Sequence, residues 1–161
     1  MDIHASPIIL KPIGYVGTDV LDEDVPRKRA EMVSNLCILD EYAEALDGID
    51  EYSHLFVLFW MHKAPPQDFH LKTHPRGRED LPLTGVLATR GRNHPNPIGL
   101  AVVELLERQG NRLQVKHLDA FDGSPILDIK PYDPYDVFTD IRVPAWWGHL
   151  SNKTGKVLKG A

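Results

Sequence analysis

Short apolar runs recur along the chain, separated by glycine, proline, asparagine and aspartate. Apolar and β-branched runs of this length, bounded by turn residues, are typical of β-strands. Residues 53–62, SHLFVLFWMH, form a nearly continuous apolar and aromatic run, which predicts a central strand buried on both faces. The other predicted strands are residues 7–18, 34–40, 84–89, 98–107, 111–121 and 125–132.

One segment predicts a helix. In DEYAEALDG, Asp40 can cap the N-terminus, Glu41 and Glu44 suit the positive end of the helix dipole, and Gly48 can end the helix. Many short strands with one short helix favour a mainly β fold, a barrel or a sandwich. The length of 161 residues favours one domain, expected over residues 1–150, with a short basic tail at 151–161.

Composition narrows the class of protein further. A net charge of −5 with 42% hydrophobic and 25% charged residues is an ordinary profile for a soluble globular protein. The lone cysteine, Cys37, lies in an apolar run and is predicted to be a buried structural thiol. No apolar stretch approaches a membrane span and the N-terminus lacks the features of a signal peptide, so we expect no membrane association and a cytoplasmic location.

Charge is distributed unevenly along the chain. An acidic balance argues against nucleic-acid binding by bulk charge. Lysines, arginines and histidines nevertheless gather between residues 62 and 94, in and around a segment at 64–82 with four prolines and no hydrophobic period. A long segment of this kind is usually functional or disordered. His70 and His74 lie within it without a third ligand at a recognisable spacing, so we expect no metal site.

A second polar segment precedes the apolar run at 98–107. Two prolines flank Asn96 and restrict it and His94 to extended conformations. Side chains at every second position of an extended segment project to the same side. The segment therefore predicts a rigid ledge of donors for an anionic or amide-rich ligand, the alternative being a solvated connection between strands. The ledge residues are Arg90, Arg92, His94 and Asn96.

A third polar segment surrounds the last predicted strand. Asp122 to Pro125, DGSP, is a strong turn motif. Asp128 and Lys130 then stand in phase among apolar residues, which turn formation does not explain. A functional site and a salt-bridged edge strand are both compatible with this pattern.

These two polar segments resemble the motifs of one family. Residues 85–106, GVLATRGRNHPNPIGLAVVELL, resemble the Gly-Val-Phe-Ala-Thr-Arg-Ser-Pro-x-Arg-Pro-Asn-Pro-Ile-Gly-Leu motif of the TsaA-like, or TrmO, family. Residues 119–135, DAFDGSPILDIKPYDPY, resemble its Asp-Gly-Thr-Pro-x-Leu-Asp-Ile-Lys-Pro-Tyr motif. Shorter similarities, PIGYVGT, VPRK and EYAEALDGIDEYSHLFVLFWMH, extend the resemblance over about residues 8 to 147.

The resemblance implies a β-barrel methyltransferase that uses S-adenosyl-L-methionine to methylate N6-threonylcarbamoyladenosine beside the tRNA anticodon. It also implies a homodimer with the cofactor near the subunit interface. Carried over by position, the expected cofactor contacts are Pro26, Arg27, Lys28, His62, Lys63, Arg90, Asn96, Leu100, Asp122, Gly123, Ser124 and Pro125.

The methyl acceptor and the catalytic base are less directly indicated. We expect the basic residues Arg76, Arg78, Arg92 and His94 to contact tRNA. A carbamoylated N6 is a poor nucleophile, so a base would help, and Asp128 and Tyr132 are the candidates. Gly91-Arg92 and His94 depart from the family motif, which leaves open methylation of a small molecule, or S-adenosylmethionine binding without chemistry.

Overall fold

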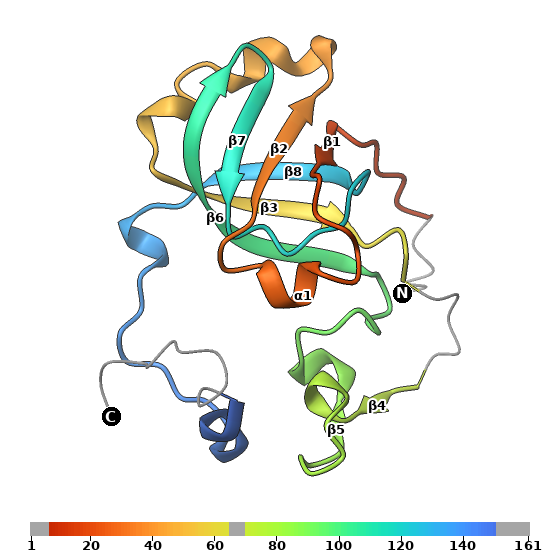
Figure 1. Cartoon of the computed structure of the whole chain (residues 1–161). Coiled ribbons are helices and arrows are strands. Elements are labelled where there is room, and N and C mark those ends of the chain that lie inside the picture. The colour runs from red at the N-terminus through yellow and green to blue at the C-terminus, as the bar shows by residue number, and fades with distance from the viewer. Residues whose placement is uncertain (1–6, 65–69, 151–161) are drawn as a thin grey trace, which may run out of the picture.

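The computed structural model describes residues 7–64 and 70–150, in which six antiparallel strands close into a barrel (Figure 1). The strand order around the barrel is β1-β2-β7-β6-β3-β8. Closure pairs each strand with two neighbours and leaves one interior to fill with side chains. The predicted mainly β, single-barrel fold is confirmed. The strands are β1 (Gly14–Gly17), β2 (Val33–Ile38), β3 (His54–Trp60), β6 (Ile98–Gln109), β7 (Arg112–Lys116) and β8 (Pro125–Pro131).

Helical structure is limited to short turns. The short α-helix α1 covers Val25–Lys28. The helix predicted to be capped by Asp40 is a 3-10 helix, Asp40–Leu46, and Leu39 occupies its N-cap position. Gly48 follows with φ 82°, a left-handed conformation that glycine adopts without strain. Further 3-10 turns are Ile49–Glu51, Pro75–Gly77, Val86–Ala88, Pro134–Asp136 and Ala145–Trp147.

The Pro-rich segment predicted as a long loop is partly structured. Within it β4 (Lys72–Thr73) pairs with β5 (Thr84–Gly85), just beyond the segment, in a separate two-stranded sheet. The strand predicted over residues 84–89 is wrong beyond Gly85, because the chain turns into the 3-10 turn at Val86–Ala88. Residues 65–69 of this segment, like the predicted tail at 151–161, lie outside the described residues.

Burial alternates along β3, so the prediction of a strand buried on both faces is wrong. Leu55, Val57 and Phe59 point into the barrel and are at most 4% exposed. Phe56 and Leu58 are only partly buried, because the outer surface of a barrel strand has no second layer to cover it. The apolar composition of β3 therefore leaves an apolar surface outside the barrel.

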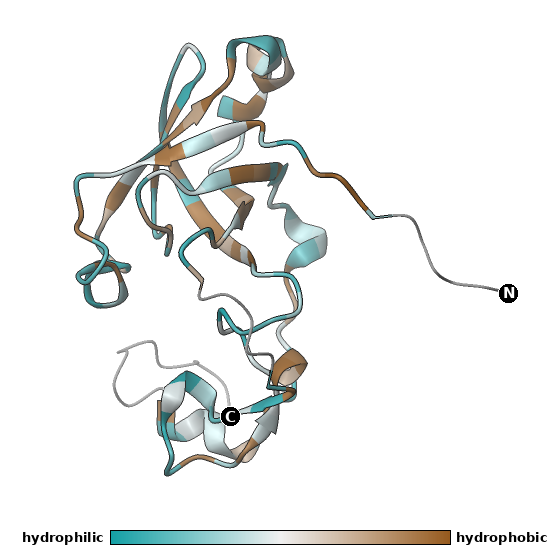
Figure 2. Ribbon diagram, turned by 90° about the vertical axis from the view of Figure 1, so that its right-hand side faces the viewer, coloured by the Kyte–Doolittle hydropathy of each residue, from teal (hydrophilic) through white to brown (hydrophobic). Residues whose placement is uncertain are grey.

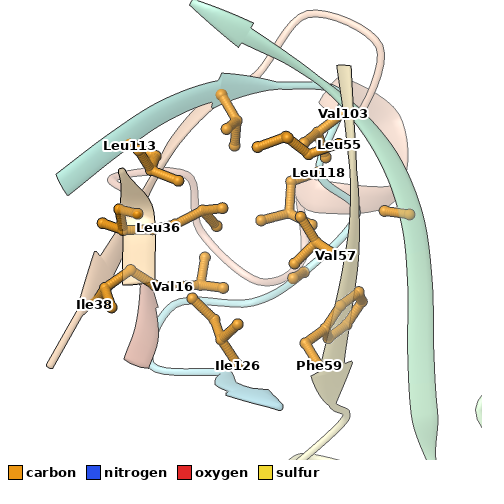
Figure 3. Packing of buried hydrophobic residues seen from close by; sticks show 14 residues of the cluster. Val16, Leu36, Ile38, Leu55, Val57, Phe59, Val103, Leu113, Leu118 and Ile126 are labelled. Carbon is orange, nitrogen blue, oxygen red and sulfur yellow. The ribbon is translucent and has the colours of Figure 1, made fainter. Parts of the chain in front are cut away.

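The barrel interior is the main hydrophobic core (Figure 3). Gly99 of β6 lies opposite Phe59, and a Cβ there would come within 2.2 Å of the Phe59 ring, so only glycine fits beneath it. β7 ends at Lys116, and the next residue, His117, has a φ of 74°. Leu118 follows in the core at 0% exposure. The fully enclosed members are Leu36, Leu55, Val57, Val103, Leu113, Val115, Leu118 and Ile126.

The N-terminal strand is shorter than predicted. β1 begins at Gly14, and Ile8, Ile9 and Leu10 are exposed in an arm that leaves the barrel (Figure 2). Pro12 lacks the N–H that a continued ladder would need. Cys37, predicted to be buried, is half-buried. Across residues 7–64 and 70–150 the structure contains no helix with the length and hydrophobicity of a membrane span.

Candidate functional site

Four chain segments meet at one end of the barrel. The pairs Trp60 with Ile98, Phe59 with Ile126, and Tyr15 with Pro125 bring the end of β3 and the end of β1 beside the starts of β6 and β8. The loops after β1 and β3 and before β6 and β8 are consequently neighbours. They carry most of the residues for which the sequence predicted a cofactor role.

The Asp122–Pro125 turn is attached to the end of β1. Gly123 N donates to Val16 O at 2.8 Å, and Val16 N donates to Ser124 O at 2.9 Å. Thr18 N donates to Asp122 Oδ1 at 3.0 Å. The turn and the loop after β1 are therefore held as one unit, and the contact with Thr18 N engages one of the two Asp122 carboxylate oxygens.

His62 and Lys63, at the end of β3, lie against this unit. The Ser124 hydroxyl, 2% exposed, lies 3.3 Å from His62 Nδ1. Lys63 forms an ion pair with Asp22 at 2.5 Å, and its ammonium lies 5.6 Å from the centre of the Phe121 ring. The structure thus brings together His62, Lys63 and Ser124, as the resemblance implied. Sequence reasoning missed Asp22 and Phe121, whose only signals were an acidic run and a lone aromatic residue.

An open depression of about 470 Å³ lies over this unit. It is lined by Thr18 to Glu23 and by Asp122, and four of these residues are acidic. S-adenosylmethionine carries ammonium, hydroxyl and amino donors, for which carboxylates are suitable acceptors, and a sulfonium whose positive charge carboxylates attract. The donor set fits the polar half of that cofactor, although one carboxylate, Asp22, is already engaged by Lys63.

The loop that continues from this depression leads into α1. Arg27 and Lys28 both pair with Asp24, and these contacts, Lys28 first and Arg27 second, hold the pKa of the Asp24 carboxyl below its ordinary value. Pro26 is exposed beside them. The three predicted contacts on α1 therefore lie close to the depression along the chain. The side chains of Arg27 and Lys28 are both paired with Asp24.

The predicted ledge is not straight, so the prediction that its side chains share one side is wrong. Bends interrupt residues 91–96. Arg90 Nη2 turns back to Leu100 O at 2.8 Å, and His94 Nε2 lies 3.0 Å from Thr89 O. Asn96 stays at the barrel end, because Met61 N donates to Pro97 O at 2.8 Å. Consecutive bends, which proline spacing alone did not reveal, separate Arg90 from Asn96.

Arg90 and Leu100 belong to a second group of residues, on the outside of the barrel. Leu58 of β3 lies directly between Leu100 of β6 and Asp128 of β8. Leu100 is 50% and its neighbour Val102 is 40% exposed. We call this surface the outer apolar face, formed by Phe56, Leu58 and Trp60 of β3 and by Ile98, Leu100 and Val102 of β6.

The two candidate bases lie along β8, away from the depression. Asp128 Oδ1 accepts from Ile129 N at 2.9 Å, and Asp128 Oδ2 pairs with Lys130 at 2.8 Å. Tyr132 packs edge-on against Phe56 at 5.3 Å between ring centres, at the opposite end of β8 from Ser124. Eight extended residues span about 26 Å. Within a single chain, Tyr132 therefore lies far from the contact between His62 and Ser124.

The candidate RNA contacts divide into two places. Arg78 donates to both Asp80 oxygens and to His149 O. Partial burial of the guanidinium, followed by repulsion from Arg29, lowers the pKa of Arg76. On the bent segment Arg92 is exposed and His94 is half-buried. Among residues 7–64 and 70–150, no cluster of three His, Cys, Asp or Glu side chains could hold a metal ion.

Known proteins have a similar barrel fold and a similar sequence. Residues 21–136 match the family model described as the tRNA-methyltransferase O N-terminal domain. An S-adenosyl-L-methionine-binding protein of Archaeoglobus fulgidus is 46% identical over 130 residues, covering 79% of this chain and 91% of the relative. Mouse tRNA (adenine(37)-N6)-methyltransferase is 32% identical over 138 residues, covering 81% of this chain and 32% of the relative.

Solved structures agree with the sequence matches. The crystal structure of TrmO from Pseudomonas aeruginosa matches with a TM-score of 0.68 and 33% identity, covering 85% of this chain. This chain spans 62% of the length of that solved chain. The class that the fold and the matches define is the β-barrel, S-adenosylmethionine-dependent tRNA methyltransferase. The chain belongs to the tRNA-methyltransferase O family.

Proposed function

We propose that this protein transfers a methyl group from S-adenosylmethionine to N6 of threonylcarbamoyladenosine in a tRNA anticodon loop. The observation that carries the proposal is the meeting of His62, Lys63 and the Asp122–Pro125 turn beside a carboxylate-lined depression. These residues lie about 60 positions apart in the sequence, and they match the family motifs. The cytoplasm, where tRNA is available, is the proposed location.

The depression and its rim would hold the cofactor. Asp122 keeps one carboxylate oxygen for a hydroxyl or ammonium donor, since Thr18 N occupies only its Oδ1. The Ser124 hydroxyl orients the His62 ring, and Lys63 holds the acidic loop through Asp22. When bound, S-adenosylmethionine supplies an electrophilic methyl group on a sulfonium. The chain's part is to align that group with the acceptor nitrogen and to exclude water.

Proton removal from the acceptor would use the outer surface of β8. Asp128 is the better candidate base, because it is half-buried and shares the outer apolar face with Leu100. Its carboxylate accepts a hydrogen bond from Ile129 N and pairs with Lys130. Tyr132 would take part only if a second subunit supplied it, since within one chain it lies at the far end of β8.

A homodimer would bring together the candidate residues at the barrel end and those on the outer apolar face. The outer apolar face exposes large aliphatic side chains on two adjacent strands, and contiguous apolar surface of this kind marks an interaction site. A second copy docked there would bring its own barrel end toward Arg90, Leu100 and Asp128. The cofactor would then lie near the subunit interface, with contacts from both chains.

A binding module without chemistry is the second candidate. It is favoured by the ion pair of Asp128 with Lys130, which already occupies the candidate base. The relative from Archaeoglobus fulgidus is named for S-adenosylmethionine binding alone. Methyl transfer to any acceptor would exclude this candidate.

Two measurements test the proposal. Calorimetric titration of S-adenosylmethionine should give binding by the wild type and weaker binding by Arg90→Ala, with Arg112→Ala on the hairpin at the other end of the barrel as the control. Incubation with labelled S-adenosylmethionine should then methylate tRNA that carries threonylcarbamoyladenosine and leave unmodified tRNA unlabelled. Equal labelling of both tRNAs would reject the proposed acceptor, and binding without labelling would favour the module.

A further inference from the structure

The barrel is closed between β1 and β8 over a very short distance. The paired residues are Gly14 with Ile126 and Tyr15 with Pro125, and the chain before β1 leaves the barrel (Figure 2). β8 continues to Pro131 and pairs there with β3. In the described part of the chain, no strand lies along the other side of β8 after Ile126. The second half of β8 is therefore an open edge.

The backbone groups of Ile129 point toward this open edge. Tyr132 N donates to His54 O at 3.1 Å, so these two facing residues are hydrogen-bonded. Hydrogen-bonded pairs alternate along an antiparallel ladder, so the backbone groups of Asp128 and Lys130 also face β3, whereas those of Ile129 face away. Ile129 N donates to the carboxylate of its own neighbour, Asp128, at 2.9 Å. A side chain thus occupies the place of a strand partner.

Residues 137–143, VFTDIRV, have the pattern of a strand and no strand partner. β-Branched side chains, which favour strands, occupy every second position, at Val137, Thr139, Ile141 and Val143. The apolar side chains of this segment are all at least 39% exposed. Among the described residues, none forms a hydrogen bond or ion pair with residues 138–143. The segment therefore offers an apolar side and a complete set of backbone donors and acceptors.

The charges of the two unpaired stretches match in one register. Each stretch carries an acidic and then a basic residue two positions apart, Asp128 and Lys130 in β8 and Asp140 and Arg142 in the segment. One antiparallel register sets each acid opposite the base of the other stretch, which stabilises a strand pair. A slip of two residues in either direction instead sets a pair of like charges opposite each other. Charge therefore selects a single register.

The apolar side chains match in the same register. Ile141 falls opposite Ile129, which packs against the barrel core from the edge. Phe138 falls opposite Tyr132, whose ring lies 5.3 Å from that of Phe56 on the outer apolar face. The added strand would thus continue both the inside of the barrel and the outer apolar face.

The segment of each chain is held away from its own β8. The 3-10 turn before it, Pro134–Asp136, is closed by a capping box with Asp133. Beyond its end, Leu150 is buried at 4% exposure and Arg78 donates to His149 O at 3.2 Å. Between these anchors the chain runs away from the barrel (Figure 1). A second copy carries the same open edge, and two-fold symmetry would fill both edges by exchange of the two segments.

We infer that residues 137–143 add an antiparallel strand to the open edge of β8 in a second copy of this chain. Lys130 then lies opposite the partner's Asp140, and Asp128 lies opposite the partner's Arg142. The inference specifies how the homodimer of the proposed function assembles, and in that respect it rests on that function. It also makes the surroundings of Asp128, the candidate base, incomplete in a single chain.

An exchange of charges tests the pairing by sedimentation velocity at several protein concentrations. Asp140→Lys and Lys130→Asp each set like charges opposite each other in a dimer of identical chains, so each should raise the dimer dissociation constant about tenfold. An equal mixture of the two variants sets opposite charges at both edges and should dimerise as the wild type does. Arg112→Asp, at an exposed position of β7 at the other end of the barrel, is the control and should leave the dimer unchanged.

Disulfide formation tests the register. In a Cys37→Ser background, Asp140→Cys chains mixed with Lys130→Cys chains should form a covalent dimer, because facing residues that exchange no hydrogen bonds have their side chains close together. Neither variant should do so alone. Ile141→Cys mixed with Lys130→Cys is the control, since this register places the two side chains on opposite faces. Equal cross-linking in both mixtures would contradict the inferred register.

Three results of the sedimentation experiment would each overturn the inference: a wild-type monomer, single variants that dimerise as the wild type does, and a mixture that stays monomeric. The last result would place the pairing within one chain. Methylation of tRNA by a wild-type monomer would reject the strand exchange and leave the methyl transfer of the proposed function standing. A charge-dependent dimer that methylates no tRNA would support the exchange and reject that activity.

Discussion

The Ser124 hydroxyl lies 3.3 Å from His62 Nδ1, which joins the turn before β8 to the end of β3. Ser124 is 2% exposed, so this hydroxyl has little access to water as an alternative partner. The contact couples the orientation of the His62 ring to the turn that also carries Asp122. The candidate cofactor site is therefore built from a tertiary contact between two motifs.

Ser124→Ala should lower the free energy of unfolding by about 1 kcal/mol, the usual net value of a hydrogen bond. It should also weaken S-adenosylmethionine binding, because the His62 ring loses its fixed partner. Ser34→Ala is the matched control, since Ser34 is 0% exposed and its hydroxyl has no partner among the described residues. Urea denaturation should show this control to be neutral or stabilising. Equal losses in both variants would mean that the contact with His62 contributes nothing.

Lys63→Met should weaken S-adenosylmethionine binding more than it weakens the fold. The ion pair with Asp22 has both side chains about 40% exposed, so it contributes at most about 1 kcal/mol to stability. Its effect lies in holding the acidic loop over the depression. In a double-mutant cycle with Asp22→Asn, calorimetry should show that the two losses of affinity do not add. Fully additive losses would show that the pair does not act as a unit.

Asp24 should make α1 sensitive to acid. Lys28, then Arg27, depress the pKa of its carboxyl, so the stabilisation is present above the unfolded-state value of about 3.9 and is lost as the pH falls through the folded-state value. Asp24→Asn removes this dependence. The urea midpoints of wild type and variant should differ at about pH 6 and converge at about pH 2. A difference that stays constant over this range would contradict the assignment.

Gly99→Ala should destabilise the barrel by about 1–3 kcal/mol, the usual cost of overpacking a filled core. The added Cβ would meet the Phe59 ring at 2.2 Å. Gly85→Ala is the control, because nothing lies within 4 Å of its added Cβ. Thermal melting of the two variants measures the difference. Phe59→Leu combined with Gly99→Ala should recover part of the loss, and no recovery would place the strain elsewhere.

Val102→Glu should convert the proposed homodimer into a monomer. Val102 lies on the outer apolar face opposite Phe56 and is 40% exposed, so a charge there is tolerated by an isolated barrel but not by an apolar interface. Val33→Glu on β2, at 42% exposure, is the control for the same change on another surface. Sedimentation of wild type and variants reports the mass. A wild-type monomer, or a dimer that survives Val102→Glu, would reject this interface.

The sequence alone indicated the barrel strands, because alternating and continuous apolar runs bounded by turn residues are local signals. It did not show which face of β3 was inside, since its residues are apolar on both faces and only closure of the barrel distinguishes them. The 3-10 form of Asp40–Leu46 was also hidden, because α-helix and 3-10 helix share the same capping and charge preferences. The pattern predicted strand positions better than their ends, as at Gly14 and Gly85.

The same division applies to the site. The resemblance to the family motifs made His62, Lys63 and Ser124 candidates for cofactor contact. Only the tertiary structure decided that strand register brings them to one barrel end, that Asp22 joins them, and that Leu100 and Asp128 lie on another face. The physical reason is that a sequence fixes local conformation and side-chain chemistry, whereas the distance between segments depends on which strands pair and in which register.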